Sequence, residues 1–201
     1  MIDTGDTGFM MICSALVLLM TPGLAFFYGG MVRRKNVVNT MMTSIFVIGI
    51  ATVMWVLFGY SLAFGVDHLG IIGDLSHLGL VGLTGKVGEY ASTIPDLGFA
   101  MFQMMFAIIT PALITGAVAG RMKFKALFLF IIFWSTLVYY PMAHMVWGIG
   151  GFLAKIGSVD FAGGNVVHIS SGVSALVLCL VLGKRKDYGK ANKRLSKVML
   201  L

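Results

Sequence analysis

The stretch Asp160-Phe161-Ala162-Gly163-Gly164-Asn165-Val166-Val167-His168-Ile169-Ser170-Ser171-Gly172 opens the last long apolar segment of the chain, which continues to Gly183. It places one imidazole, that of His168, inside a run long enough to cross a membrane. An ionisable side chain at that depth is costly, and such residues are typical of ion and substrate pathways. The stretch therefore predicts a membrane protein in which His168 faces a pore.

Composition points to an integral membrane protein. The 201 residues are 58% apolar and only 11% charged, with a mean hydropathy of +0.93, whereas soluble domains carry about 25% charged residues. The net charge of +7 is interpreted as a signal of membrane topology, and we expect no nucleic-acid partner. Cys13 and Cys179 lie in apolar segments and suggest neither a disulfide framework nor a metal site. Because no nucleotide loop or metal cluster is evident, an enzyme has little support and no cofactor is expected.

Five segments are long and apolar enough to span a bilayer, at approximately 8–32, 38–64, 97–120, 125–147 and 161–183. Each must be helical, since a lone strand cannot satisfy its backbone in lipid. The predicted fold class is thus an all-α integral membrane protein with five transmembrane helices. Pro22 and Pro111 each remove a hydrogen bond within a span, so we expect a break near Thr21-Pro22-Gly23 and a kink at Pro111. Gly116 and Gly120 form a small-residue face for close helix contact.

The positions of the basic residues predict the orientation. All but two of the 15 Lys and Arg residues follow spans one, three and five; the exceptions are Lys86 and Lys155. By the positive-inside rule, the N-terminus lies outside and residues 184–197 are cytosolic, where they could also touch anionic lipid. Residues 65–96 then form an outer loop, in which His68 and His77 are expected to be solvated.

Depth along the helices orders the candidate pore residues. If span five starts near Phe161, His168 lies about seven residues in, or roughly 10 Å at about 1.5 Å per residue. Phe106 lies roughly 14 Å into span three by the same rise, with Phe102 one turn above it and Trp147 at the outer mouth. Aromatic rings above one imidazole suit a small cation that is first attracted and then stripped of water or of a proton.

Each residue also has a plainer interpretation. Trp147, together with Tyr139 and Tyr140, could belong to an aromatic interface belt. Phe102 and Phe106 could be ordinary i, i+4 packing. His144 could be an interface or hydrogen-bonded structural histidine, and Asp160 could be a helix N-cap. The residues alone thus predict a polytopic channel or transporter without naming its substrate.

Six short motifs together resemble the ammonium transporter family (Amt/Mep/Rh), in the family's order and across the entire chain. They are Ala25-Phe26-Phe27-Tyr28-Gly29-Gly30, Arg34-Lys35-Asn36-Val37, Gly59-Tyr60-Ser61-Leu62-Ala63-Phe64-Gly65, Phe102-Gln103 with Phe106, Ala143-His144-Met145-Val146-Trp147-Gly148, and Asp160-Phe161-Ala162-Gly163-Gly164 with Val166-Val167-His168.

The resemblance implies a role for each site residue. Phe106 would be one ring of a stacked phenylalanine gate, and Phe102 and Trp147 would line the outer site that recruits ammonium. Asp160 would be the buried aspartate that shapes this site through backbone hydrogen bonds. His168 would be the first of two pore histidines, and no metal is implied. Ammonium would bind as the cation, lose its proton and pass along an apolar pore.

The resemblance also implies an assembly. Family members are homotrimers in the plasma membrane, built from two five-helix repeats of inverted topology, and many bind a PII signalling protein at the cytosolic face. We therefore expect this chain to be the first repeat, a fragment of a transporter for ammonium or ammonia with methylammonium as an analogue. An ammonium sensor and a Rh-like gas channel are the alternatives. One departure is Ala119-Gly120-Arg121, where the family often has glutamate in the middle position.

Overall fold

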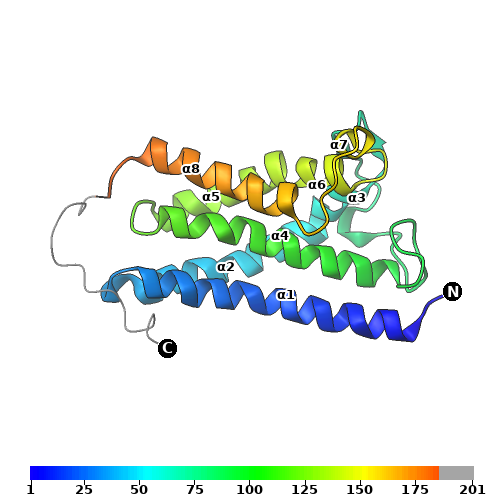
Figure 1. Cartoon of the computed structure of the whole chain (residues 1–201), viewed down its shortest axis with the longest axis horizontal. Coiled ribbons are helices and arrows are strands. Elements are labelled where there is room, and N and C mark those ends of the chain that lie inside the picture. Colours follow the sequence, from blue (N-terminus) through cyan, green and yellow to red (C-terminus); the bar gives the residue numbers. More distant parts are fainter. Residues whose placement is uncertain (186–201) are drawn as a thin grey trace.

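The computed structural model describes residues 1–185 and is mostly helical. Within that part, five helical stretches are long and apolar enough to cross a membrane: Thr4–Met31, Arg34–Phe64, Asp96–Val118, Phe124–Lys155 and Gly164–Leu182. They run side by side along the long axis of the molecule (Figure 1). The predicted fold class of five membrane-spanning helices is confirmed. The approximate predicted bounds lie within four residues of these stretches, except that the fourth stretch continues through α7 to Lys155 beyond the predicted end at 147; the fifth begins at Gly164, three residues after the predicted start.

The spans are divided by short irregular elements. In chain order they are α1 (Thr4–Met31), the 3-10 turn η1 (Arg34–Asn36), α2 (Val37–Met54), the π turn η2 (Trp55–Gly59), α3 (Tyr60–Phe64), β1 (Asp67–His68), β2 (Ile72–Gly73), the 3-10 turn η3 (Leu78–Leu80), α4 (Asp96–Val118), α5 (Phe124–Trp134), the π turn η4 (Ser135–Tyr139), α6 (Tyr140–Trp147), α7 (Phe152–Lys155), the π turn η5 (Gly164–Ile169) and α8 (Ser170–Leu182). β1 and β2 form a small antiparallel hairpin in the loop after α3.

Helix α1 runs without interruption through Pro22, so the predicted break in span one was wrong. Proline removes one intrahelical hydrogen bond, but a break would leave further backbone groups unpaired in hydrocarbon, at several kcal/mol each. A continuous helix with one missing bond is therefore the less costly structure. Pro111 likewise lies inside the continuous α4.

Helix α4 is the centre of the bundle. It is the most buried of the five spans and packs against α1, α2 and α8. Tyr28 of α1 donates a hydrogen bond from its hydroxyl to the Leu113 carbonyl, at 2.8 Å, and its ring lies against Gly116. The predicted close contact at Gly116 is thus present. Gly120 is not part of that face, because α4 ends at Val118 and Gly120 sits in the following turn with a φ of 71°.

Gly116→Ala is expected to lower the free energy of unfolding by about 2 kcal/mol, since it overpacks a close helix contact. A Cβ atom at this position would lie 2.5 Å from Tyr28 ring carbons. The matched control is Gly49→Ala, where a Cβ atom meets nothing within 4 Å. Alanine should stabilise that helix position by about 0.5–1 kcal/mol. Equal effects of the two substitutions in detergent unfolding experiments would contradict the packing account.

The π turns place the outer ends of two spans against each other. Each π turn adds a residue to one helical turn and re-aims the side chains that follow. A Cβ atom on Gly59 of η2 would lie 2.6 Å from the ring of Tyr140, which begins α6, so α3 and α6 approach closely. Tyr139 and Tyr140 are each 1% exposed and belong to the core, so their predicted place in an aromatic belt was wrong.

Candidate functional site

An open pocket of about 650 Å³ lies between the C-terminal ends of α3 and α6 and the N-terminal half of α4, beside the loop that precedes η5. Its lining is mostly aromatic, with one amide and one carboxylate. The lining residues are Phe64, Tyr90, Phe99, Phe102, Gln103, Phe106, Val146, Trp147, Asp160, Phe161, Ala162 and Gly163. Four of the predicted site residues, Phe102, Phe106, Trp147 and Asp160, therefore meet in one pocket.

The three predicted rings form a connected wall. Phe102 and Phe106 are one turn apart on α4, and their ring centroids are 5.0 Å apart in an edge-to-face arrangement. The Phe106 ring lies 6.3 Å from that of Trp147 on α6. All three side chains are only partly buried, so their rings can contact a molecule in the pocket. Aromatic faces arranged in this way attract cations.

Asp160 organises the loop on the other side of the pocket. Its carboxylate accepts three backbone N–H groups, from Gly164 at 2.6 Å and from Asn165 and Val166 at 2.9 Å. These N–H groups begin η5 and have no partner within their own helix. The Asp160 carbonyl also accepts a hydrogen bond from Trp147 Nε1, at 3.3 Å. Asp160 is partly exposed in this structure, whereas the family resemblance implied a buried aspartate.

His168 does not line this pocket. Because the fifth helix begins at Gly164, His168 is about four residues into it, or roughly 6 Å along the axis, and the predicted depth of roughly 10 Å was too large. Its side chain is exposed and makes no hydrogen bond to residues 1–185. Residues 1–185 therefore form the aromatic pocket, but they leave the His168 imidazole on an open side of the bundle.

His144 is fully buried, with 0% of its surface exposed. Its two ring nitrogens lie 3.0 Å from the Ala63 carbonyl oxygen and 3.0 Å from Asp67 Oδ1. This geometry supports the hydrogen-bonded structural histidine, which was one of the two alternatives. The outer histidines differ from each other: His68 is exposed, but His77 is half-buried and lies edge-on to Tyr60.

Sequence reasoning missed a second group of rings in the same pocket. Tyr90 and Phe99 stack with centroids 5.2 Å apart, and Phe64 contacts both rings edge-on. Phe99 had a detectable signal, because it lies one helical turn before Phe102 on the same face of α4. Tyr90 is in a loop and had none. Gln103 was noted only within a motif, and its amide oxygen is buried without a hydrogen-bond partner among the described residues.

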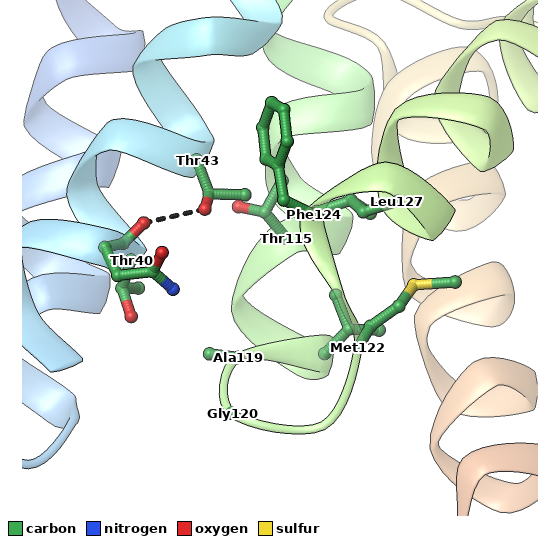
Figure 2. A pocket seen from close by; sticks show the side chains of 10 residues that line it. Thr40, Thr43, Thr115, Ala119, Gly120, Met122, Phe124 and Leu127 are labelled. Atoms are coloured by element: carbon green, nitrogen blue, oxygen red, sulfur yellow. Dashed lines mark hydrogen bonds between the residues drawn. The ribbon is translucent and has the colours of Figure 1, made fainter.

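A second, smaller pocket lies at the opposite end of the bundle, between α2, the end of α4 and α5 (Figure 2). Its side chains include Thr40, Thr43 and Thr115, with Phe124 and Leu127 at its edge. The Thr43 hydroxyl donates to the Asn39 carbonyl at 2.7 Å, as the dashed line in Figure 2 shows. None of the residues lining this pocket is ionisable, so it is a polar but uncharged cavity.

The loop between α3 and α4 carries two carboxyl groups whose pKa values are low, those of Asp67 and Asp74. Hydrogen bonds keep the pKa of each carboxyl below its ordinary value, chiefly the bond from His144 to Asp67 and the bond from Ser76 to Asp74. In residues 1–185, no group of three or more His, Cys, Asp or Glu side chains could hold a metal ion.

Five apolar spans with an aromatic pocket at one end of the bundle define a multi-pass helical membrane protein. The sequence profile of the Ammonium Transporter Family matches residues 8–199, and the chain belongs to that family. It is 58% identical to an ammonium transporter of Bacillus subtilis over 183 residues, which cover 91% of this chain and 45% of the relative. It is 48% identical to ammonium transporter 1 of Dictyostelium discoideum over 190 residues, covering 94% of this chain and 41% of that protein.

Solved structures show the same fold. The crystal structure of Candida albicans Mep2 matches with a TM-score of 0.87 and 33% identity, covering 99% of this chain and 45% of Mep2. A structure titled Sensor Amt Protein matches with a TM-score of 0.82 at 24% identity, covering 94% of this chain and 48% of that protein, and that likeness shows the fold alone. The chain spans somewhat less than half the length of each of these proteins.

Proposed function

We propose that this chain supplies the outer recruitment site and one half of the pore of an ammonium transporter. The observation that carries the proposal is the aromatic wall of Phe102, Phe106 and Trp147, which faces an open pocket in a member of the ammonium transporter family. Ammonium is a small cation that binds aromatic faces. Methylammonium, its common analogue, has the same charge and keeps all but one of the N–H donors.

The pore requires a second wall. The relatives are about twice as long as this chain, and His168 is exposed on the flank of α8. We assign that second wall to a second five-helix repeat, which would enclose His168 and supply a partner histidine. Phe106 is then one ring of the gate between the recruitment site and the pore, and His168 accepts or relays the proton that ammonium loses on entry.

The orientation follows from charge. Arg33, Arg34 and Lys35 lie at the same end of the bundle as Arg121 and Lys123, opposite to the aromatic pocket. By the positive-inside rule, the pocket faces outward and the N-terminus lies outside. The membrane itself, the plasma membrane, is what the family resemblance implies. Residues 184–197 would be cytosolic; all but the first two lie outside the described residues. A homotrimer, and a PII protein bound at the cytosolic face, complete the proposed assembly.

Uptake of labelled methylammonium by cells that lack other ammonium transporters tests the function. The complete protein should support saturable uptake that ammonium inhibits. Trp147→Leu should raise the half-saturation concentration about tenfold, since a desolvated cation–π contact contributes about 1–2 kcal/mol. Phe133→Leu is the matched control, because Phe133 is an exposed ring on the same span and does not line the pocket.

Two outcomes would count against these assignments. Cells that express the complete protein but show no uptake above background would reject the transport function. An unchanged half-saturation concentration in Trp147→Leu would support the alternative interpretation, in which Trp147 belongs to an aromatic interface belt.

A further inference from the structure

The contact with the Ala63 carbonyl determines which ring nitrogen of His144 carries the first proton. The ring is completely buried, and Nδ1 lies 3.0 Å from the carbonyl oxygen of Ala63. A carbonyl oxygen can only accept a hydrogen bond, so Nδ1 carries the hydrogen. In a neutral imidazole, Nε2 would then have no hydrogen and would present a lone pair.

The groups around Asp67 fix the second ring proton. Nε2 of His144 lies 3.0 Å from Asp67 Oδ1, and the same oxygen accepts the Gly70 N–H at 2.7 Å. The Lys155 ammonium lies 3.7 Å from Oδ2. The hydrogen bond from His144 is the largest of the effects that keep the pKa of this carboxyl low, followed by Gly70 and Lys155, against an opposing effect of desolvation. An ionised carboxylate can only accept, so Nε2 must donate and the ring is an imidazolium.

The surroundings of the ring suit a positive charge. Ala63 lies in the last turn of the helix formed by α2, η2 and α3, and the carbonyl end of a helix stabilises a cation. Asp67 provides the compensating negative charge that a buried cation requires. The other titratable groups around the pair are Lys155 on α7 and Tyr90 in the outer loop, where burial raises the pKa of the tyrosine.

The pair joins the β1–β2 hairpin to α6, and the hairpin also contacts the segment that follows Trp147. Asp67 begins β1, and the Gly70 carbonyl accepts the backbone N–H of Phe152 at 2.8 Å. The chain after α6 approaches so closely that a Cβ atom on Gly151 would lie 2.4 Å from the His144 carbonyl oxygen. Trp147 itself is one helical turn beyond His144 on α6.

We propose that His144 and Asp67 form a charged latch that positions Trp147 against the outer pocket. Neither residue lines the aromatic pocket, so both are positioning residues. Asp67 lines an adjacent pocket of about 600 Å³, which also holds the titratable groups His77, Glu89 and Asp96. The contribution of the latch to stability depends on the ionisation of the Asp67 carboxyl. Because folding lowers the pKa of Asp67, the stabilisation is present above the ordinary aspartate value of about 4 and is lost as the pH falls through the lowered value.

The protonation state can be measured directly on the wild-type protein. In the complete protein labelled with ¹⁵N-histidine, NMR at pH 7 should show one histidine with both ring nitrogens protonated, as the two hydrogen bonds of His144 require. His144→Gln should remove that signal. Asp67→Asn should leave the ring singly protonated at neutral pH, while His68→Gln, a change at the exposed neighbour in the same hairpin, should leave it unchanged. A neutral His144 ring at pH 7 in the wild-type protein would overturn the proposal.

The effect on positioning is measured by uptake, and this arm rests on the proposed transport function. Asp67→Asn should raise the half-saturation concentration for methylammonium about fivefold, because asparagine keeps an acceptor oxygen for His144 and loses only the charge, a fraction of the value of a charge-assisted hydrogen bond, with little change in the maximal rate. His68→Gln should match the wild type. An unchanged half-saturation concentration in Asp67→Asn would refute the positioning role. Failure of the wild-type protein to take up methylammonium would instead reject the proposed function, and the NMR result would still decide whether the charged latch exists.

Discussion

Asp160→Ala is expected to lower the free energy of unfolding by about 3 kcal/mol and to abolish ammonium recruitment. One carboxylate satisfies the N–H groups of Gly164, Asn165 and Val166, and hydrogen bonds to a charged acceptor contribute about 1.5–3 kcal/mol each before the cost of ordering is subtracted. Alanine leaves all three donors without this acceptor at the start of η5. The loop would then lose the conformation that holds the Asp160 carbonyl against the Trp147 ring nitrogen.

Two substitutions make the prediction for Asp160 specific. Asp160→Asn retains one acceptor oxygen, so it should cost about half as much as alanine. Asp3→Ala is the matched control, because Asp3 caps α1 through a single hydrogen bond to the Asp6 N–H at 2.9 Å, which is worth about 1 kcal/mol. Unfolding in detergent micelles, followed by circular dichroism, measures all three. If Asp160→Ala costs no more than Asp3→Ala, the carboxylate is not the organiser of this loop.

The membrane made the fold largely predictable from hydropathy. Backbone groups have no water to pair with in the bilayer core, so each long apolar run must be a helix. The predicted bounds lie within four residues of the helical stretches, except at the end of the fourth, which continues to Lys155. The start of the fifth was placed too early because Phe161 and Ala162 are apolar, although both are exposed in the loop that wraps around the Asp160 carboxylate. The three π turns had no sequence signal, since one added residue does not disturb a run that is apolar on all sides.

The outer site was only partly predictable, because its parts are joined over long sequence separations. Trp147, Phe102 and Phe106 could be placed together by depth and by family motif. The contact between His144 and Asp67 spans 77 positions, and nothing in the local pattern around Asp67 distinguishes it from the other acidic residues of the outer loop. Tyr90 reaches the pocket through the irregular segment between η3 and α4, whose path only the three-dimensional structure defines.

His168→Ala in the complete protein is expected to reduce methylammonium uptake by roughly 100-fold, while changing the free energy of unfolding by no more than about 0.5 kcal/mol. The size of the first effect is that expected for the loss of a group that transfers a proton. The second follows because the imidazole is exposed and makes no hydrogen bond within residues 1–185, and the proposed second repeat would enclose it as the wall of an open pore and not as part of a packed core, so that its removal leaves no cavity in the core. A large functional effect with a small effect on stability separates a pore residue from a packing residue.

The neighbouring substitution Ile169→Ala tests whether the effect belongs to the imidazole. Ile169 is on the same turn of η5 and is 56% exposed, but its side chain carries no proton and no hydrogen-bonding group. If uptake depends on the chemistry of His168, Ile169→Ala should retain most of the wild-type rate, and Asp160→Ala should fail for a different reason, through loss of structure at the outer site. Wild-type uptake in His168→Ala would show that ammonium crosses without this imidazole, and the pore would then have to depend on groups outside the described residues.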